Sequence, residues 1–186
     1  MTYSQPLEEF ILENWNNKDK LNEKLSKFCF YDCPSDLIKG FMYHIGLNGY
    51  KLDLNEANTF YLIVLAQELN NKYALHCLGL QYYSDNNFNN AEEHWLSALA
   101  VDPKFKYSLY HLGLLYENQN NYKKAEEYYE KYIDINPNDE YVIDRLKKIK
   151  SRKEKEASND NKVLKEKLNE LEKSLKEIKE VICNRD

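Results

Sequence analysis

The chain has 186 residues, and its hydrophobic content of 42% and charged content of 31% are those of a soluble globular protein with one substantial core. The net charge of −5 is unevenly distributed: residues 1–144 hold 12 Lys and Arg against 22 Asp and Glu, whereas residues 145–186 hold 14 against 9. The acidic part is a poor surface for nucleic acid. The four cysteines are scattered and do not have the spacing of a disulfide framework. The longest apolar run, residues 60–66, is too short for a signal peptide or a membrane span. We therefore expect a cytoplasmic protein, with the nucleus as the alternative.

Residues 1–35 are predicted to form an N-terminal helical cap. Leu7, Phe10, Ile11 and Trp15 share one helical face, and a second face follows at Leu21, Leu25 and Phe28. About thirty residues are too few for a separate core, so we expect Phe10 and Trp15 to pack on the helices that follow.

Residues 36–71 begin after Pro34 and Ser35, which restart the chain. An apolar helical face, made of Leu37, Ile38, Phe41, Met42 and Ile45, predicts a helix that ends at Gly46 or Gly49. Asp53 and Glu56 are spaced as in a capping box and predict a second helix that runs to Leu69.

Residues 72–138 state one pattern twice at an interval of 34 residues. The first copy has Leu75, Leu78, Gly79 and Tyr82 on one helical face, then Ala91, Trp95 and Pro103; the second has Leu109, Leu112, Gly113 and Tyr116, then Ala125, Tyr129 and Pro137. The spacing predicts two antiparallel helices in each copy, with small residues where the helices approach and large ones around the crossing. One such pair cannot cover its own apolar surface, so neighbouring pairs must stack.

This pattern resembles the tetratricopeptide repeat (TPR) family, although Leu75 and Leu109 stand where Trp is commonest. Subtracting 34 from Ala91, Trp95 and Ala98 gives Ala57, Tyr61 and Val64, which indicates a degenerate copy in residues 36–71. In its first helix Gly46 is one position out of step with Gly79, which predicts a loop near Tyr50 that is one residue shorter. We therefore predict an all-α TPR-type solenoid with repeats at 36–71, 72–105 and 106–138.

Residues 139–157 are predicted to form a basic capping helix, with apolar Tyr141, Ile143, Leu146 and Ile149 and an outer face of Lys and Arg. The basic run at 145–155 could instead bind nucleic acid or another anionic surface, but no aromatic residues are interleaved with the charges as single-strand binding needs. Nucleic acid is therefore the alternative partner, and we expect no membrane association.

Residues 158–186 begin with Ser158 to Asn161, which interrupt the apolar pattern. The residues that follow are spaced 4, 3, 4, 3 and 4 apart, as in the seam of a coiled coil: Leu164, Leu168, Leu171, Leu175, Ile178 and Ile182. We expect this segment to self-associate or to bind another helix. The alternative is a helix folded back on the repeats.

On the first helix of each repeat, a second stripe of residues runs beside the core-facing residues of the repeat pattern. It is displaced from them by one position. In the TPR family this stripe lines the concave groove, and the resemblance implies a protein partner bound there as a peptide or helix. Some relatives hold acidic tails with Lys, Arg and Asn on the stripe; those residue types are absent here, so that function is not carried over. The alternative is that part of the stripe packs between neighbouring helices or under the N-terminal cap. The stripe residues are Tyr73, His76, Cys77, Leu80 and Tyr83, then Tyr107, Tyr110, His111, Leu114 and Glu117.

Catalytic and metal-binding patterns are weak in this sequence. It has no G-x-S-x-G motif, P-loop or H-E-x-x-H motif. Cys29 and Cys33 with His44 lack a fourth ligand, and His76, Cys77 and His111 are better explained as buried or groove-lining side chains. We expect a non-enzymatic interaction scaffold without a cofactor or metal.

Overall fold

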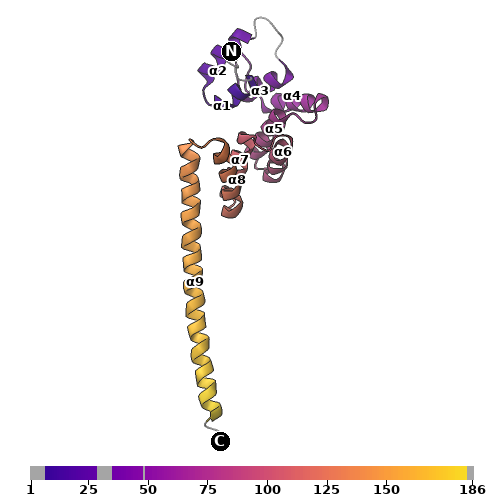
Figure 1. The fold of residues 1–186 in the computed structure, drawn as a ribbon. Helices are drawn as coiled ribbons and strands as arrows, with labels where there is room; N and C mark the ends of the chain where they lie inside the picture. The colour runs from indigo at the N-terminus through magenta and orange to yellow at the C-terminus, as the bar shows by residue number, and fades with distance from the viewer. Residues whose placement is uncertain (1–6, 29–34, 48, 184–186) are drawn as a thin grey trace. The chain divides into compact units, whose positions relative to one another are not determined.

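The protein is described by a computed structural model that covers residues 7–28, 35–47 and 49–183 (Figure 1). It divides into two compact units, Met1–Pro137 and Asn138–Asp186. The described residues form nine α-helices and no strand. The helices of the first unit are α1 (Leu7–Glu13), α2 (Lys18–Phe28), α3 (Asp36–Ile45), α4 (Leu54–Gln67), α5 (Lys72–Ser84), α6 (Phe88–Val101), α7 (Lys106–Asn118) and α8 (Tyr122–Ile135).

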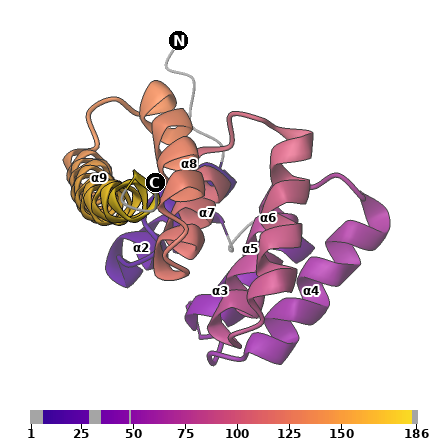
Figure 2. The ribbon, with the colours of Figure 1, turned by 90° about the horizontal axis from the view of Figure 1, so that it is seen from below.

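Three helical hairpins follow the two N-terminal helices in the first unit. Helix α3 pairs with α4, α5 with α6 and α7 with α8, and each hairpin stacks on the next through α4 against α5 and α6 against α7. Figure 2 shows the α3–α4, α5–α6 and α7–α8 hairpins in succession. The helical solenoid expected from the sequence is therefore confirmed.

Glycine marks the crossing point in every hairpin. A Cβ added to Gly79 would overlap the ring of Trp95, and one added to Gly113 would overlap the ring of Tyr129. These two rings are fully buried. Only glycine leaves the space that lets a large aromatic ring of the second helix lie against the backbone of the first.

The degenerate hairpin uses Gly40 at this crossing, so the predicted match to Gly46 is wrong. A Cβ on Gly40 would overlap the ring of Tyr61, whereas Gly46 has a φ of 71° and forms the left-handed C-cap of α3. The connection from α3 to α4 spans residues 46–53, against 85–87 in the next hairpin, so the loop is longer than in the other repeats and not shorter. The second helix does follow the interval of 34, because Ala57, Tyr61 and Val64 are buried like their counterparts Ala91, Trp95 and Ala98.

Asparagine ends and restarts the helices within the two regular hairpins. Asn86 and Asn120 have φ values of 59° and 58°, and Asn tolerates this left-handed conformation better than most residues. The next residue in each turn, Asn87 or Asn121, caps the following helix by accepting a backbone N–H with its side chain. Asp53 does the same for α4.

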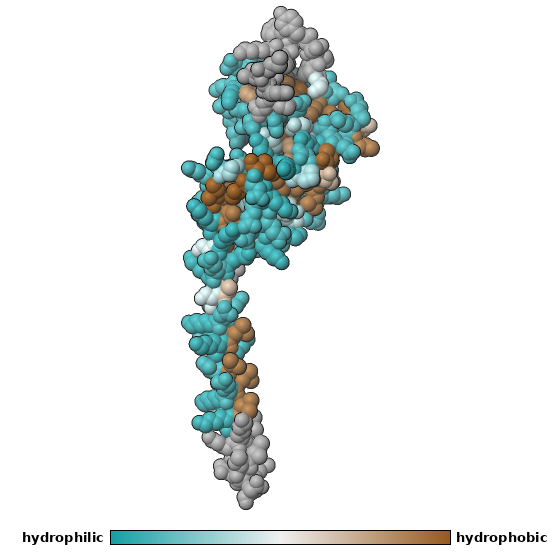
Figure 3. All heavy atoms as spheres, viewed as in Figure 1, coloured by the Kyte–Doolittle hydropathy of each residue, from teal (hydrophilic) through white to brown (hydrophobic). Residues whose placement is uncertain are grey.

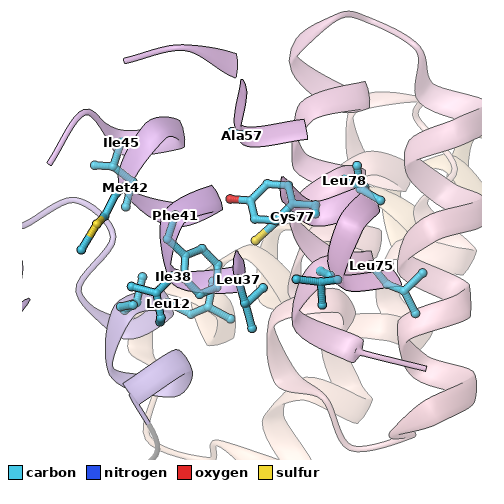
Figure 4. Packing of buried hydrophobic residues seen from close by; sticks show 14 of the residues in the cluster. Leu12, Leu37, Ile38, Phe41, Met42, Ile45, Ala57, Leu75, Cys77 and Leu78 are labelled. Atoms are coloured by element: carbon cyan, nitrogen blue, oxygen red, sulfur yellow. The ribbon is translucent and has the colours of Figure 1, made fainter. Parts of the chain in front are cut away.

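One continuous core joins the N-terminal helices to the first hairpins. Leu12 of α1, Ile38 and Phe41 of α3 and Cys77 of α5 belong to a single buried cluster (Figure 4). The ring of Trp15 lies edge-on to Phe41 at 5.9 Å, so the expected contact of Trp15 with the first hairpin is present.

The second unit contains α9, a helix of 44 residues from Glu140 to Cys183. It continues through Ser158 to Asn161, so these polar residues interrupt the apolar pattern without ending the helix, since neither proline nor glycine is present there. Across the described residues, no helix combines the length and apolarity needed to cross a membrane.

Candidate peptide-binding groove

The first helices of the hairpins, α3, α5 and α7, carry the candidate groove. Because Gly40, Gly79 and Gly113 occupy equivalent positions, residues at the same distance from each glycine are equivalent as well. Residue types differ at the position four after the glycine, which is His44, Tyr83 or Glu117. In the first and third hairpins this residue contacts the hydroxyl of the crossing tyrosine. His44 Nδ1 lies 3.3 Å from the hydroxyl of Tyr61, and Glu117 accepts a hydrogen bond of 2.9 Å from the hydroxyl of Tyr129.

His76 and Cys77 are buried, unlike the rest of the predicted stripe. The His76 Nδ1 atom lies 3.1 Å from the Ser108 hydroxyl of α7, and the His76 carbonyl accepts a 3.1 Å hydrogen bond from Trp95 Nε1. Burial raises the pKa of the Cys77 thiol, which is hydrogen-bonded to Tyr61. His76 and Cys77 therefore join neighbouring helices and present no surface to a partner.

The other predicted groove residues are half-buried. Tyr83 accepts a 2.6 Å hydrogen bond from Asn118, which links the first helices of the second and third hairpins. The Tyr110 ring meets His111 edge-on at 5.1 Å and also faces Tyr132. The half-buried positions are Tyr73, Leu80, Tyr83, Tyr107, Tyr110, His111, Leu114 and Glu117.

Three histidines lie among these rings, and their pKa values fall below the usual range. Burial lowers the pKa of His44 and of His111 to about 4. Burial, and then the proximity of His111 and His44, also lower the pKa of His76 well below its usual value. At neutral pH the three imidazoles are uncharged, so this part of the groove is apolar and aromatic and carries no positive charge.

The sequence-based prediction missed the residues that border the groove at the starts of α5 and α7. Lys72 forms a 2.6 Å ion pair with Asp102, and Lys106 forms a 2.7 Å ion pair with Glu13 of α1. A cavity of about 180 Å³ opens beside them, lined by Glu9, Tyr107 and Lys104 among others. The recurrence of Lys72 and Lys106 at the interval of 34 is a signal that could have identified them.

Metal-ligating side chains do not converge in the described part of the chain. His76 and His111 have ring centroids 5.0 Å apart, but Cys77 is engaged with Tyr61. No group of three or more His, Cys, Asp or Glu side chains suited to a metal occurs among the residues described. Cys29 and Cys33 lie outside those residues.

Comparison with known proteins gives a matching family model and several similar solved structures, among them the two that follow. The family model described as "Tetratricopeptide repeat" matches residues 78–140. The crystal structure of the Sgt2 TPR domain from Aspergillus fumigatus is 29% identical, with a TM-score of 0.49, and the match covers 56% of this chain and 70% of that one. The crystal structure of MamA is 20% identical, with a TM-score of 0.49, over 84% of this chain and 99% of that one.

A comparison with curated protein sequences gave no match. The family match covers the third hairpin and the second from residue 78 onward, where the interval of 34 residues and the crossing of glycine with an aromatic ring both recur. TPR arrays are modules that bind other proteins. Residues 78–140 therefore match the tetratricopeptide repeat family, whose general role is that of a protein–protein interaction scaffold.

Proposed function

We propose that the groove of α5 and α7 binds a peptide or helix that carries large apolar side chains. The observation that carries this proposal is the half-buried, mainly apolar stripe formed by Leu80, Tyr83, Tyr110 and Leu114 on successive first helices. Half-buried tyrosines are already held by their neighbours and lose little conformational freedom on binding, while the rest of the ring is available as contact area.

Leu114→Glu tests the groove, with Leu96→Glu as its matched control. Leu96 is 40% exposed and lies on α6, a second helix outside the stripe. Peptides selected from a random library against the full chain provide the ligand, and fluorescence anisotropy gives the affinity. We expect Leu114→Glu to weaken binding about ten-fold or more and Leu96→Glu to leave it unchanged. Equal affinities of both variants for every selected peptide would rule out this groove.

We propose in addition that α9 pairs with α9 of a second copy. Leu164, Leu168, Leu171 and Leu175 are 55–64% exposed, and Figure 3 shows apolar residues gathered along one side of this helix. The side chains of Ile178 and Ile182 lie outside the described residues. Burying an aliphatic side chain fully contributes roughly 1.5–3 kcal/mol, so a partner helix would stabilise this seam.

The charges beside the seam favour a parallel pair. In parallel register Lys167 faces Glu172 of the second copy, and Asp160 faces Lys165, so both pairs attract. In an antiparallel pair that overlaps the whole seam, Glu172 faces Glu172 of the other copy. Asn161 falls at a seam position, and a polar Asn there favours one register at some cost in stability.

Disulfide trapping tests the orientation of the pair. In a variant whose native cysteines are replaced by serine, Leu164→Cys should form a disulfide-linked dimer under mild oxidation, because residue 164 faces its own counterpart only in the parallel pair. Glu166→Cys, on an exposed position off the seam, is the control. A dimer trapped equally by both variants would contradict the parallel seam.

The basic run at 145–155 is the weaker candidate for a binding surface. Lys148 is paired with Asp144 at 2.6 Å, and the guanidinium of Arg145 donates a 2.7 Å hydrogen bond to the Tyr141 hydroxyl and lies 4.9 Å from its ring. These contacts support a solvated helix face with local charge compensation, and no feature of the described residues favours a nucleic-acid site over it.

A further inference from the structure

Helix α1 contacts the candidate groove at the third hairpin. The Tyr107 hydroxyl donates a 3.3 Å hydrogen bond to the backbone carbonyl of Glu9, and the Lys106 ammonium lies 2.7 Å from a carboxylate oxygen of Glu13. Tyr107 belongs to the groove stripe and Lys106 borders it. The N-terminal segment therefore reaches across the first unit to the end of the array farthest from it in sequence.

The same segment contacts the groove at the first hairpin. Trp15, two residues after α1, has its ring 5.9 Å from Phe41 and 5.0 Å from His44, both edge-on. By the register of the crossing glycines, Phe41 and His44 are equivalent to Leu80 and Tyr83, which belong to the stripe on α5. In the degenerate hairpin, Trp15 thus covers two positions whose equivalents on α5 are half-buried.

Helix α5, between them, also lies close to α1. Burial, and then the charges of Glu9 and Glu8, raise the pKa of Tyr73 to about 12. Tyr73 and Tyr107 are half-buried, and both pack against the buried apolar cluster that includes Ile11 and Leu12. Stripe positions on all three first helices therefore meet the N-terminal segment.

Helix α1 is held weakly enough for another helix to displace it. The helix has seven residues, which is too short to be stable by itself in water, and its buried side chains are Ile11 and Leu12. Its ion pair is accessible to solvent, since the side chains of Lys106 and Glu13 are 27% and 37% exposed. Surface pairs of this kind add little to stability.

From these contacts we infer that α1 is an internal occupant of the groove, and that the external partner is an acidic amphipathic helix that displaces it. The inference rests on the proposed function of the groove. Residues 7–13 read LEEFILE, with Glu9 and Glu13 one helical turn apart and Ile11 and Leu12 turned to the core. A partner helix of the same chemistry would place one carboxylate near Lys106 and its apolar side chains over the stripe.

A labelled peptide of residues 5–17 serves as the probe, and the full chain carrying Glu13→Lys serves as the variant with a loosened α1. Glu93→Lys is the matched control, with the same change of charge at an exposed position on α6. Anisotropy measures peptide binding. Acrylamide quenching measures the opening of α1, because Trp95 is fully buried and Trp15 is the other of the two tryptophans.

We expect Glu13→Lys to increase quenching and to bind the peptide several-fold more tightly than the unmodified chain or Glu93→Lys, because the ion pair is lost and the introduced lysine repels Lys106 as well. A peptide with its own Glu13→Lys change should bind the loosened chain more weakly, because it repels Lys106.

The other outcomes separate the two proposals. Equal peptide affinity in all three chains would overturn the inference and leave groove binding intact. Increased quenching with no peptide binding would contradict the groove function itself. If Glu13→Lys shows neither increased quenching nor peptide binding, α1 is a fixed part of the core and the inference is overturned.

Discussion

Each hairpin depends on a single glycine at the point where its two helices cross. Gly40→Ala, Gly79→Ala and Gly113→Ala should each lower the free energy of unfolding by about 1–3 kcal/mol, because the added Cβ overlaps a buried ring. In an open helical site the same change would stabilise the protein by roughly 0.5–1 kcal/mol, so the sign of the effect is diagnostic.

Gly49→Ala is the comparison for this series, measured by urea unfolding. Apart from its chain neighbours, no described residue has an atom within 4 Å of its Cβ position, so its cost comes from the left-handed backbone, with a φ of 83°. If Gly40→Ala were neutral or stabilising, Gly40 could not be the crossing residue of the first hairpin.

Histidine burial predicts a loss of stability in mild acid. The pKa values of His44 and His111 are about 4 in the folded chain and 6.5 in the reference state, so the unfolded chain binds more protons between these limits. Their contribution to stability is fully present above pH 6.5 and falls as the pH drops toward 4, on the order of 1–2 kcal/mol per histidine by pH 5.

Urea unfolding between pH 7.5 and 5 measures this dependence. Replacing both residues, with His44→Gln and His111→Gln in one chain, should flatten the decline between pH 6.5 and 5, whatever the change in absolute stability. A decline as steep in this variant as in the unmodified chain would show that other groups cause it.

At the scale of single elements, the turn of each regular hairpin depends on two adjacent asparagines with different tasks. Asn121→Ala should lower the free energy of unfolding by about 0.5–2 kcal/mol, because α8 loses the side chain that accepts from Lys124 N. Asn120→Gly should change it by less than about 0.5 kcal/mol, since glycine also adopts a φ near 58°. Thermal and urea unfolding measure both effects. Comparable losses of unfolding free energy in the two variants would contradict the separate roles of the two asparagines.

Local patterns predicted most of the helices, and the exceptions have identifiable causes. The interval of 34 identified α4 through α8 because hairpins of equal loop length repeat their sequence in step. The same interval misassigned the glycine of α3. The longer loop at residues 46–53 shifts α3 along the sequence, whereas α4 keeps the interval of 34. Gly46 looked suitable for the crossing, but it serves as a cap.

The candidate groove was only partly accessible to the same reasoning. The displaced stripe is periodic, so its residues could be named from the sequence, but periodicity does not distinguish the buried His76 from the half-buried Tyr110. Burial of His76 depends on Ser108 of the next hairpin. Packing of part of the stripe under the N-terminal cap was the alternative prediction, but the sequence does not show which residues make it, since Glu9 and Glu13 contact residues at the opposite end of the first unit.

At the scale of the whole molecule, pairing through α9 should double the mass of the chain in solution. Sedimentation equilibrium over a range of concentrations should give a dimer for the full chain and a monomer for Leu168→Glu combined with Leu171→Glu, because both changes place charges in the seam. Lys173→Glu, exposed and off the seam, is the control. Monomers for the unmodified chain at all concentrations would contradict self-association.

The ion pair between Glu13 and Lys106 has a kinetic consequence. Its residues are 93 apart in the chain, whereas Trp95 and His76, which close a hairpin, are 19 apart. Because the entropy lost in closing a loop grows with its length, the hairpins should form early in refolding and α1 should dock last. Stopped-flow refolding should show the helical circular dichroism signal recovering before the fluorescence of Trp15 in a Trp95→Phe chain. Coincident recovery of both signals would mean that the N-terminal segment folds together with the repeats.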